Sequence, residues 1–123
     1  MGQAVIHFEI MGRDGARLRS FYQELFSWAI DADNPFDYGV VGPEPTLDGE
    51  GTGIGGGIGA TQGEQPPHVT LYVEVSDVED SLARAEQLGG TRLMGPEAIM
   101  EGVEIGLFHD LDGNMIGVIK GRP

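Results

Sequence analysis

The chain has 123 residues, enough for one compact domain and too few for a multidomain machine. Seven lysines and arginines against twenty aspartates and glutamates give a formal net charge of −13, and this charge repels phosphate backbones and anionic membranes. We therefore expect a small-molecule ligand, with no nucleic-acid and no membrane partner. The chain has no cysteine, so disulfides, thiolate nucleophiles and cysteine-bound zinc are excluded.

The sequence carries no signal for a membrane span or for secretion. No apolar run approaches the roughly 20 residues that cross a bilayer. The N-terminal sequence MGQAVIHFEI has neither the basic nor the apolar region of a signal peptide. The expected location is the cytoplasm.

The first half of the chain predicts a strand, a helix and then further strands. Residues 4–10 (AVIHFEI) alternate between an apolar face and a mixed face that carries His7 and Glu9, as a half-buried strand does. Asp14 precedes apolar residues at helical spacing, so it is the predicted N-cap of a helix. Three short strands are predicted after this helix, in residues 29–41 and 53–60.

The second half predicts the same order again. Residues 68–75 (HVTLYVEV) alternate, with His68, Thr70 and Tyr72 on one face. Asp77 precedes a helix that ends at the glycine pair of residues 89–90. The three strands predicted after it are TRLM, VEIGLFHD and NMIGVIK, the last two joined by a hairpin at an Asp-Gly turn.

The two halves are one module written twice. Aligning Asp14 with Asp77, an offset of 77 − 14 = 63 residues, superposes the apolar positions of the two first strands. We expect a single domain over residues 1–123, built from module 1 (1–60), a linker (61–67) and module 2 (68–123).

The mixed faces of the two first strands are the predicted functional region. His7, Glu9, Thr70 and Tyr72 make these faces too polar for a dry core and too mixed for an ordinary solvent-exposed face. Such residues suit the lining of a cleft, where a few polar groups orient a ligand.

Four segments in this order carry a resemblance to a known family: VIHFEI, RSFYQELFSW, DVEDSLARAEQLGG and DLDGNMIGV. Through them the chain resembles the vicinal oxygen chelate superfamily of glyoxalases, ring-cleaving dioxygenases and bleomycin-resistance proteins. The resemblance covers nearly the whole chain. It implies an α+β fold in which two tandem βαβββ modules form a curled mixed sheet around a cleft. It also implies a homodimer that contributes to the pocket, and it leaves the activity open.

Metal-dependent members of this superfamily usually carry a His or a similar ligand on the first strand of each module. His7 stands seven residues before Asp14, at the first of these positions. Thr70 stands seven residues before Asp77, at the second, and threonine is a poor ligand. His68 lies two residues further out, and because a strand rises roughly 3.3 Å per residue it is displaced by about 6.6 Å.

The same members carry a carboxylate on the last strand of each module. Here the motif DGNMI is followed by Gly117, and residues 53–60 (GIGGGIGA) contain no acid. A lone His7, with at best one oxygen from Glu9, would hold a divalent ion poorly. We therefore predict no bound metal and no cofactor.

Aromatic side chains complete the predicted ligand site. Tyr72 shares the mixed face of its strand, and Trp28 opens a strand after the first helix, so both could stack on a flat ligand. The predicted ligand-binding residues are His7, Glu9, Trp28, Tyr38, His68, Thr70, Tyr72 and Phe108.

Two classes of function fit these residues. The first is a binding protein that resembles the bleomycin-resistance branch and sequesters a planar or cationic molecule without a metal; it accounts for the missing ligands. The second is an enzyme that resembles the glyoxalases or dioxygenases and uses His7 and Glu9 as acid and base. A regulatory or structural module with an empty cleft is a third possibility.

Overall fold

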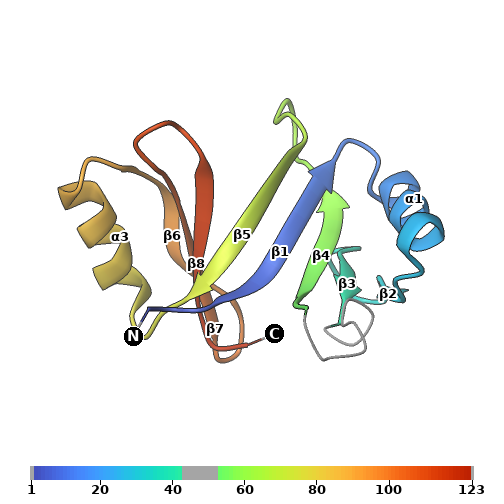
Figure 1. Ribbon diagram of the computed structural model, residues 1–123, viewed down its shortest axis with the longest axis horizontal. Coiled ribbons are helices and arrows are strands. Elements are labelled where there is room, and N and C mark those ends of the chain that lie inside the picture. Colours follow the sequence, from blue (N-terminus) through green and yellow to red (C-terminus); the bar gives the residue numbers. More distant parts are fainter. Residues whose placement is uncertain (1, 43–52, 123) are drawn as a thin grey trace. The chain divides into compact units, whose positions relative to one another are not determined.

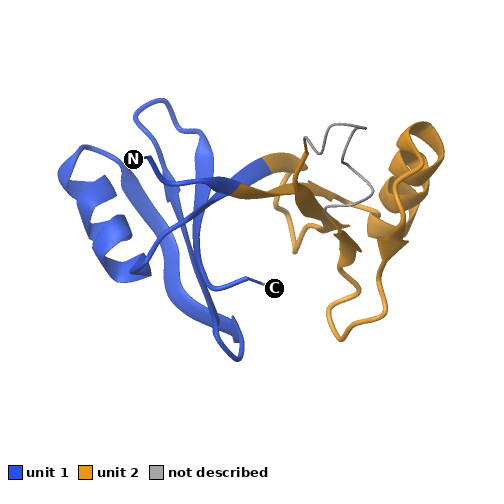
Figure 2. Ribbon diagram, turned by 60° about the horizontal axis from the view of Figure 1, so that its bottom comes forward, with its two compact units in different colours: residues 1–5, 70–123 blue, residues 6–69 orange. Residues whose placement is uncertain are grey.

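The order of strands and helices predicted for each half is present in the structure, a computed structural model that describes residues 2–42 and 53–122 (Figure 1). The α+β class with two βαβββ modules is confirmed. The chain divides into two compact units, one of residues 6–69 and one of residues 1–5 together with 70–123 (Figure 2). The first residues belong to the second of these units, where Glu74 N donates a hydrogen bond of 2.8 Å to Ala4 O.

The unit of residues 6–69 has the strand order β2-β3-β4-β1. In this order β1 runs parallel to β4, and the other neighbours are antiparallel. Its elements are β1 (Val5–Gly12), α1 (Gly15–Phe26), β2 (Ile30–Asp31), β3 (Gly39–Val41) and β4 (Gly55–Ala60).

Helix α1 begins at the predicted cap, and its first residue lies directly against β4. The Asp14 side chain accepts a hydrogen bond of 3.1 Å from Arg17 N. Gly15 is buried against the backbone of β4, where an added Cβ atom would lie a tight 3.2 Å from Ala60 N and 3.3 Å from Gly59 C. Of the predicted apolar stripe, three side chains are more than half exposed: Phe21, Leu25 and Phe26.

The other unit repeats this topology, with the strand order β5-β8-β7-β6 and β5 parallel to β8. The neighbours β8-β7 and β7-β6 are antiparallel. The predicted repeat of the module is therefore present in the pairing pattern as well as in the order of elements. The elements are β5 (His68–Glu74), α3 (Val78–Gln87), β6 (Thr91–Met100), β7 (Val103–His109) and β8 (Met115–Lys120).

The core of this unit lies between α3 and its sheet. Val78 and Leu82 are fully buried and pack with Val75 and Val118. The Asp77 side chain caps the helix by accepting a hydrogen bond of 2.9 Å from Asp80 N, as predicted. The helix ends before Gly89, whose φ of +103° lies in the left-handed region that favours glycine.

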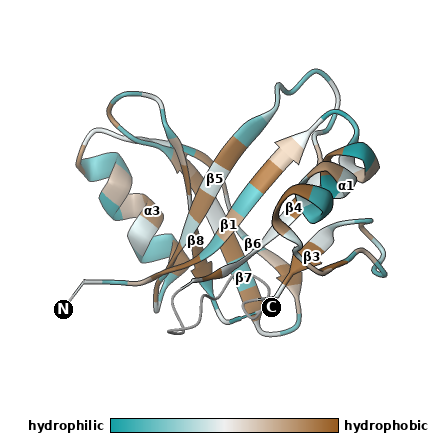
Figure 3. Cartoon of the chain, turned by 45° about the vertical axis from the view of Figure 1, so that its right-hand side comes forward, coloured by the Kyte–Doolittle hydropathy of each residue, from teal (hydrophilic) through white to brown (hydrophobic). Residues whose placement is uncertain are grey.

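The predicted alternation of apolar and polar residues is visible along β1 and β5, where hydrophobic and hydrophilic bands succeed one another (Figure 3). The hairpin predicted between β7 and β8 is also present, with Gly113 at a φ of +85°. No helix in the described part of the chain is long and apolar enough to cross a bilayer.

Candidate functional site

The polar face of β1 borders a row of glycines in β4. His7 pairs with Gly55 and Glu9 pairs with Gly57 in the parallel register. Because paired residues on neighbouring strands point to the same face, the β4 positions beside His7 and Glu9 carry no side chain. Space is therefore open next to the two polar groups.

The aromatic ring of Tyr38 occupies that space. Tyr38 precedes β3, and its ring lies directly on Gly57: a Cβ atom at residue 57 would be 1.9 Å from the ring and its hydroxyl. Glycine at this position is thus required by the close approach of the tyrosine.

The Tyr38 hydroxyl joins His7 to Glu9. The hydroxyl donates a hydrogen bond of 2.9 Å to Glu9 Oε2, and its oxygen lies 3.1 Å from His7 Nε2. A phenol has one hydrogen, and an ionised carboxylate can only accept. With Glu9 ionised and accepting the phenol hydrogen, the contact with Tyr38 assigns the imidazole hydrogen of His7 to Nε2, which donates it.

Burial shapes the charge of this chain of three side chains. All three are half-buried, and burial lowers the pKa of His7, since the charged imidazolium is less well solvated there. A neutral imidazole with its hydrogen on Nε2 satisfies the hydrogen-bond directions above. The arrangement can pass a proton when His7 Nδ1 takes one up from a bound molecule or from water: His7 Nε2 then gives its hydrogen to the Tyr38 oxygen, and Tyr38 gives its own to Glu9.

Trp28 lies with a different group of residues. Its ring centroid is 5.4 Å from Phe8 and 5.9 Å from Tyr22, whose ring it stacks on at 14°. Phe8 alternates with His7 and Glu9 along β1 and so points to the opposite face of the strand. The structure therefore does not bring Trp28 together with Tyr38.

Tyr72 and Thr70 share a face of β5 in the other unit. Tyr72 pairs with Gly117, and its ring lies on that glycine, where a Cβ atom would be 2.4 Å away. Tyr72 is 5% exposed and Thr70 is 2% exposed. Thr70 Oγ1 has no hydrogen-bond partner among the described residues.

The two units repeat the same local arrangement with different residues. The offset of 63 residues between the modules places Tyr72 at the position of Glu9, since 9 + 63 = 72. Strand pairing places Gly117, the partner of Tyr72, at the position of Gly57, the partner of Glu9. In each unit, a glycine of the last strand is covered by a tyrosine ring. A search for reactive side chains misses Gly57 and Gly117 as site residues. The alternate glycines of β4 are the sequence feature that could have pointed to Gly57.

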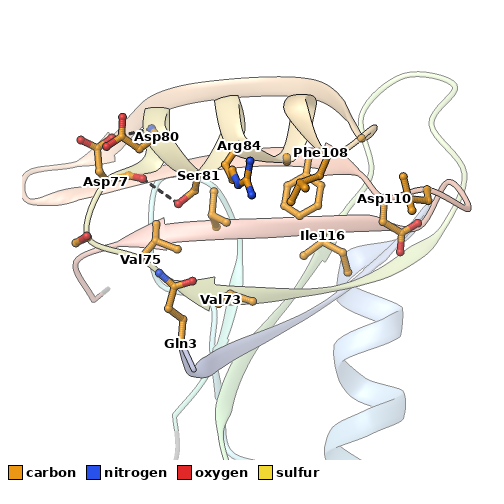
Figure 4. Close-up of a pocket in the computed structure, with 16 residues that line it drawn as sticks. Gln3, Val73, Val75, Asp77, Asp80, Ser81, Arg84, Phe108, Asp110 and Ile116 are labelled. Carbon is orange, nitrogen blue, oxygen red and sulfur yellow. Dashed lines mark hydrogen bonds between the residues drawn. The ribbon is translucent and has the colours of Figure 1, made fainter. Parts of the chain in front are cut away.

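Phe108 lies on the helix-covered face of its sheet. It pairs with Ile116 and packs against the core beneath α3, whereas Gly117, one residue on, is covered by Tyr72 on the other face. Phe108 lines a cavity of about 580 Å³ between α3 and the strands. Figure 4 shows Phe108 and Ile116 among the side chains that line it.

His68 lies at the start of β5, where its ring contacts the chain two residues earlier. Its Nδ1 is 3.1 Å from Pro66 O. It lines a second cavity, of about 560 Å³, beside α1. The predicted site residues that the structure brings together are thus His7, Glu9 and Tyr38 in one unit and Thr70 and Tyr72 in the other.

The donors on the β1 face do not fit a tightly held metal ion. In the part of the chain that the structure describes, no three His, Asp or Glu side chains are close enough to share one. An ion bonded to His7 Nε2 would have to displace the Tyr38 hydroxyl from between its partners. Glycines occupy the last-strand positions, where a carboxylate would otherwise add a ligand.

Comparison with known proteins identifies the family: the chain belongs to the glyoxalase-like domain family, whose sequence model matches residues 7–119. The resemblance to the vicinal oxygen chelate superfamily is confirmed by this match and by the solved structures that are similar. No curated protein sequence matches the chain significantly.

Three solved structures illustrate the similarity. A variant of Streptomyces coelicolor methylmalonyl-CoA epimerase, in complex with 2-nitronate-propionyl-CoA, has 14% identity and a TM-score of 0.68, over 98% of this chain and 99% of that chain. Methylmalonyl-CoA epimerase from Mycobacterium tuberculosis has 15% identity and a TM-score of 0.63, over 97% and 88%. A glyoxalase/bleomycin resistance protein/dioxygenase superfamily member from Vibrio splendidus 12B01 has 15% identity and a TM-score of 0.62, over 96% and 98%. At these identities the similarity shows the fold alone.

Proposed function

We propose that this protein binds a small planar or cationic organic molecule at the face formed by His7, Tyr38 and Glu9, without a metal ion. The observation that carries the proposal is the position of the Tyr38 hydroxyl, hydrogen-bonded to both other side chains. This arrangement fills the space between the two candidate metal donors and leaves a half-buried set of polar and aromatic groups on one face.

The chemistry of the three residues supports this choice of ligand. The Glu9 carboxylate and the net charge of −13 attract cations. The Tyr38 ring, packed on Gly57, is a rigid surface on which a flat ligand can stack. The solved complex of the Streptomyces coelicolor epimerase with 2-nitronate-propionyl-CoA supports the use of this fold for small organic ligands.

A homodimer is part of the proposal. Phe21, Leu25 and Phe26 expose more than half of their surface on one helix, and exposed apolar groups of this kind are typical of protein interfaces. Sedimentation velocity of the unmodified protein should give the mass of a dimer. A monomer at micromolar concentration would contradict the proposed homodimer.

An enzyme that uses acid-base chemistry is the second candidate, and the continuous hydrogen-bonded chain favours it. His7 and Glu9 are joined through a hydroxyl that can relay a proton between them. In this candidate the substrate gives its proton to, or takes it from, His7 or Glu9, and Tyr38 connects these two side chains.

Calorimetric titration with proflavine, a planar cation, tests the proposal, with anthracene-2-carboxylate as the planar anion for comparison. We expect micromolar binding of proflavine and weaker binding of the anion. Tyr38→Ala should weaken proflavine binding roughly tenfold, because a lost stacking contact is worth about 1.4 kcal/mol. Unchanged affinity in this variant, or no binding of either probe, would contradict the proposal.

Variants of the two flanking residues separate the candidates. His7→Ala should leave much of the affinity of a sequestering protein, whereas an acid-base enzyme should lose turnover by roughly 10²-fold or more in His7→Ala and in Glu9→Gln. His68→Ala is the matched control, because His68 makes its contact with Pro66 O outside the chain of three. Trp28 is a poor reporter for these titrations, since it packs on Phe8 on the opposite face of β1.

A further inference from the structure

The loop before β3 holds the backbone of Tyr38 through one side chain. Asn34 Oδ1 accepts hydrogen bonds from Phe36 N at 3.1 Å and from Tyr38 N at 3.0 Å. Asn34 Nδ2 donates a hydrogen bond of 2.6 Å to Tyr38 O. Both backbone polar groups of Tyr38 are therefore bound by the amide of Asn34.

This set of contacts matches the chemistry of a side-chain amide. The oxygen has two lone pairs and the nitrogen has two hydrogens, so one residue can accept twice and donate once. An aspartate in the same place could accept but not donate, and an alanine could do neither. The three contacts thus depend on the identity of residue 34 and not only on the shape of the loop.

The residues on both sides of Tyr38 are held as well. Asp37 has a φ of +50°, and its carbonyl oxygen accepts a hydrogen bond of 3.0 Å from Arg19 Nη1. The aliphatic part of Arg19 covers Gly39, where a Cβ atom would be 2.3 Å from it. Arg19 therefore fixes the neighbours of Tyr38, while Asn34 fixes the residue itself.

From this geometry we infer that Asn34 is the positioning residue of the site: it sets the backbone from which the Tyr38 hydroxyl reaches between His7 and Glu9. The inference rests on the function proposed above, in which that hydroxyl organises the binding face. The hydroxyl lies at the far end of the side chain, so a small rotation of the backbone moves it out of hydrogen-bond range of both partners. The hydrogen bonds of the Asn34 side chain go to the backbone of Phe36 and Tyr38, so Asn34 acts on the site through Tyr38.

The experiment reads the side-chain nitrogens of His7 by NMR as the pH is varied, because they report the hydrogen bond to Tyr38 directly. Tyr38→Phe, which removes the hydroxyl, gives the reference change. Asn34→Ala is expected to move the His7 nitrogen shifts and titration in the same direction and to a comparable extent. His7 signals that stay as in the unmodified protein would overturn the inference.

Asn114→Ala is the matched control. Asn114 also stabilises a turn with its amide, donating a hydrogen bond of 2.9 Å to Asp110 Oδ2, and it belongs to the unit that does not contain Tyr38. It should lower stability and leave the His7 signals unchanged. If this control moved the His7 signals as much as Asn34→Ala does, the effect would be general loosening and the inference would fail.

A substitute variant and a readout that needs no ligand keep the test decisive. Should Asn34→Ala not fold, Asn34→Asp replaces it: this variant keeps the acceptor but places a carboxylate against Tyr38 O, so unchanged His7 signals in it would count against the inference. Because the NMR measurement needs no ligand, its failure is separate from that of the proposed function, which falls if proflavine does not bind.

Discussion

Gly57→Ala is expected to break the hydrogen-bonded chain of His7, Tyr38 and Glu9. The added methyl group would lie 1.9 Å from the Tyr38 ring, so the ring must leave its place on β4. Tyr38 is half-buried and the collision is with the far end of its side chain, which can swing toward solvent. We therefore expect a loss of about 1–2 kcal/mol in unfolding free energy, mainly from the lost hydrogen bonds, measured by urea unfolding. Proflavine affinity should fall as it does in Tyr38→Ala.

A double-mutant cycle shows whether the collision with Tyr38 is the cause. Once Tyr38→Ala has removed the ring, adding Gly57→Ala should cost less than about 0.5 kcal/mol, because an alanine fits the vacated space. An equal cost in both backgrounds would mean that the ring does not lie on Gly57.

Gly117→Ala is expected to be the more destabilising of the two glycine changes, at about 3 kcal/mol. Its methyl group would lie 2.4 Å from ring atoms of Tyr72. Tyr72 is 5% exposed, so its ring cannot swing into solvent and the neighbouring residues must shift. Urea unfolding measures the loss.

Two comparisons accompany the Gly117 measurement. Gly2→Ala, at a position where no atom lies within 4 Å of the added Cβ, should leave the stability unchanged. Adding Tyr72→Val to Gly117→Ala should recover part of the loss by making room. A Gly117→Ala variant as stable as the unmodified protein would contradict the packing of Tyr72 on β8.

Local signals in the sequence predicted most of the fold. Asp14 and Asp77 mark the starts of the two helices because a carboxylate after a strand can cap the free backbone N–H groups. The period of two in residues 4–10 and 68–75 identified the strands, and the offset of 63 residues identified the repeated module. These signals act within a few residues of one another, which is why they can be read without a structure.

The site was less predictable, since it depends on contacts between distant residues. Nothing near Tyr38 in the sequence indicates that its ring lies on Gly57, because that contact follows from the pairing of β1, β3 and β4. Phe108 lies on the face under α3 because of strand register, and a shift of one residue would place it on the other face. Trp28 follows α1 and stacks on Tyr22 of that helix, away from Tyr38.

In each unit a tyrosine ring covers a glycine of the last strand, and this packing explains why no carboxylate stands there. At Gly57 and Gly117 an aromatic ring takes the volume in which a larger side chain would project. Restoring a metal ligand at either position would therefore require removing the ring as well as changing the glycine.

The proposed function requires that the Tyr38 hydroxyl, and not a metal ion, lies between His7 and Glu9. The most direct test of this requirement is a crystal structure of the protein soaked in zinc chloride and, separately, in nickel chloride, with anomalous scattering to locate the ions. We predict that the Tyr38 hydroxyl stays between His7 Nε2 and Glu9 Oε2 and that no anomalous peak lies within bonding distance of either atom. An ion bonded to His7 Nε2, at full occupancy and with Tyr38 displaced, would contradict the account.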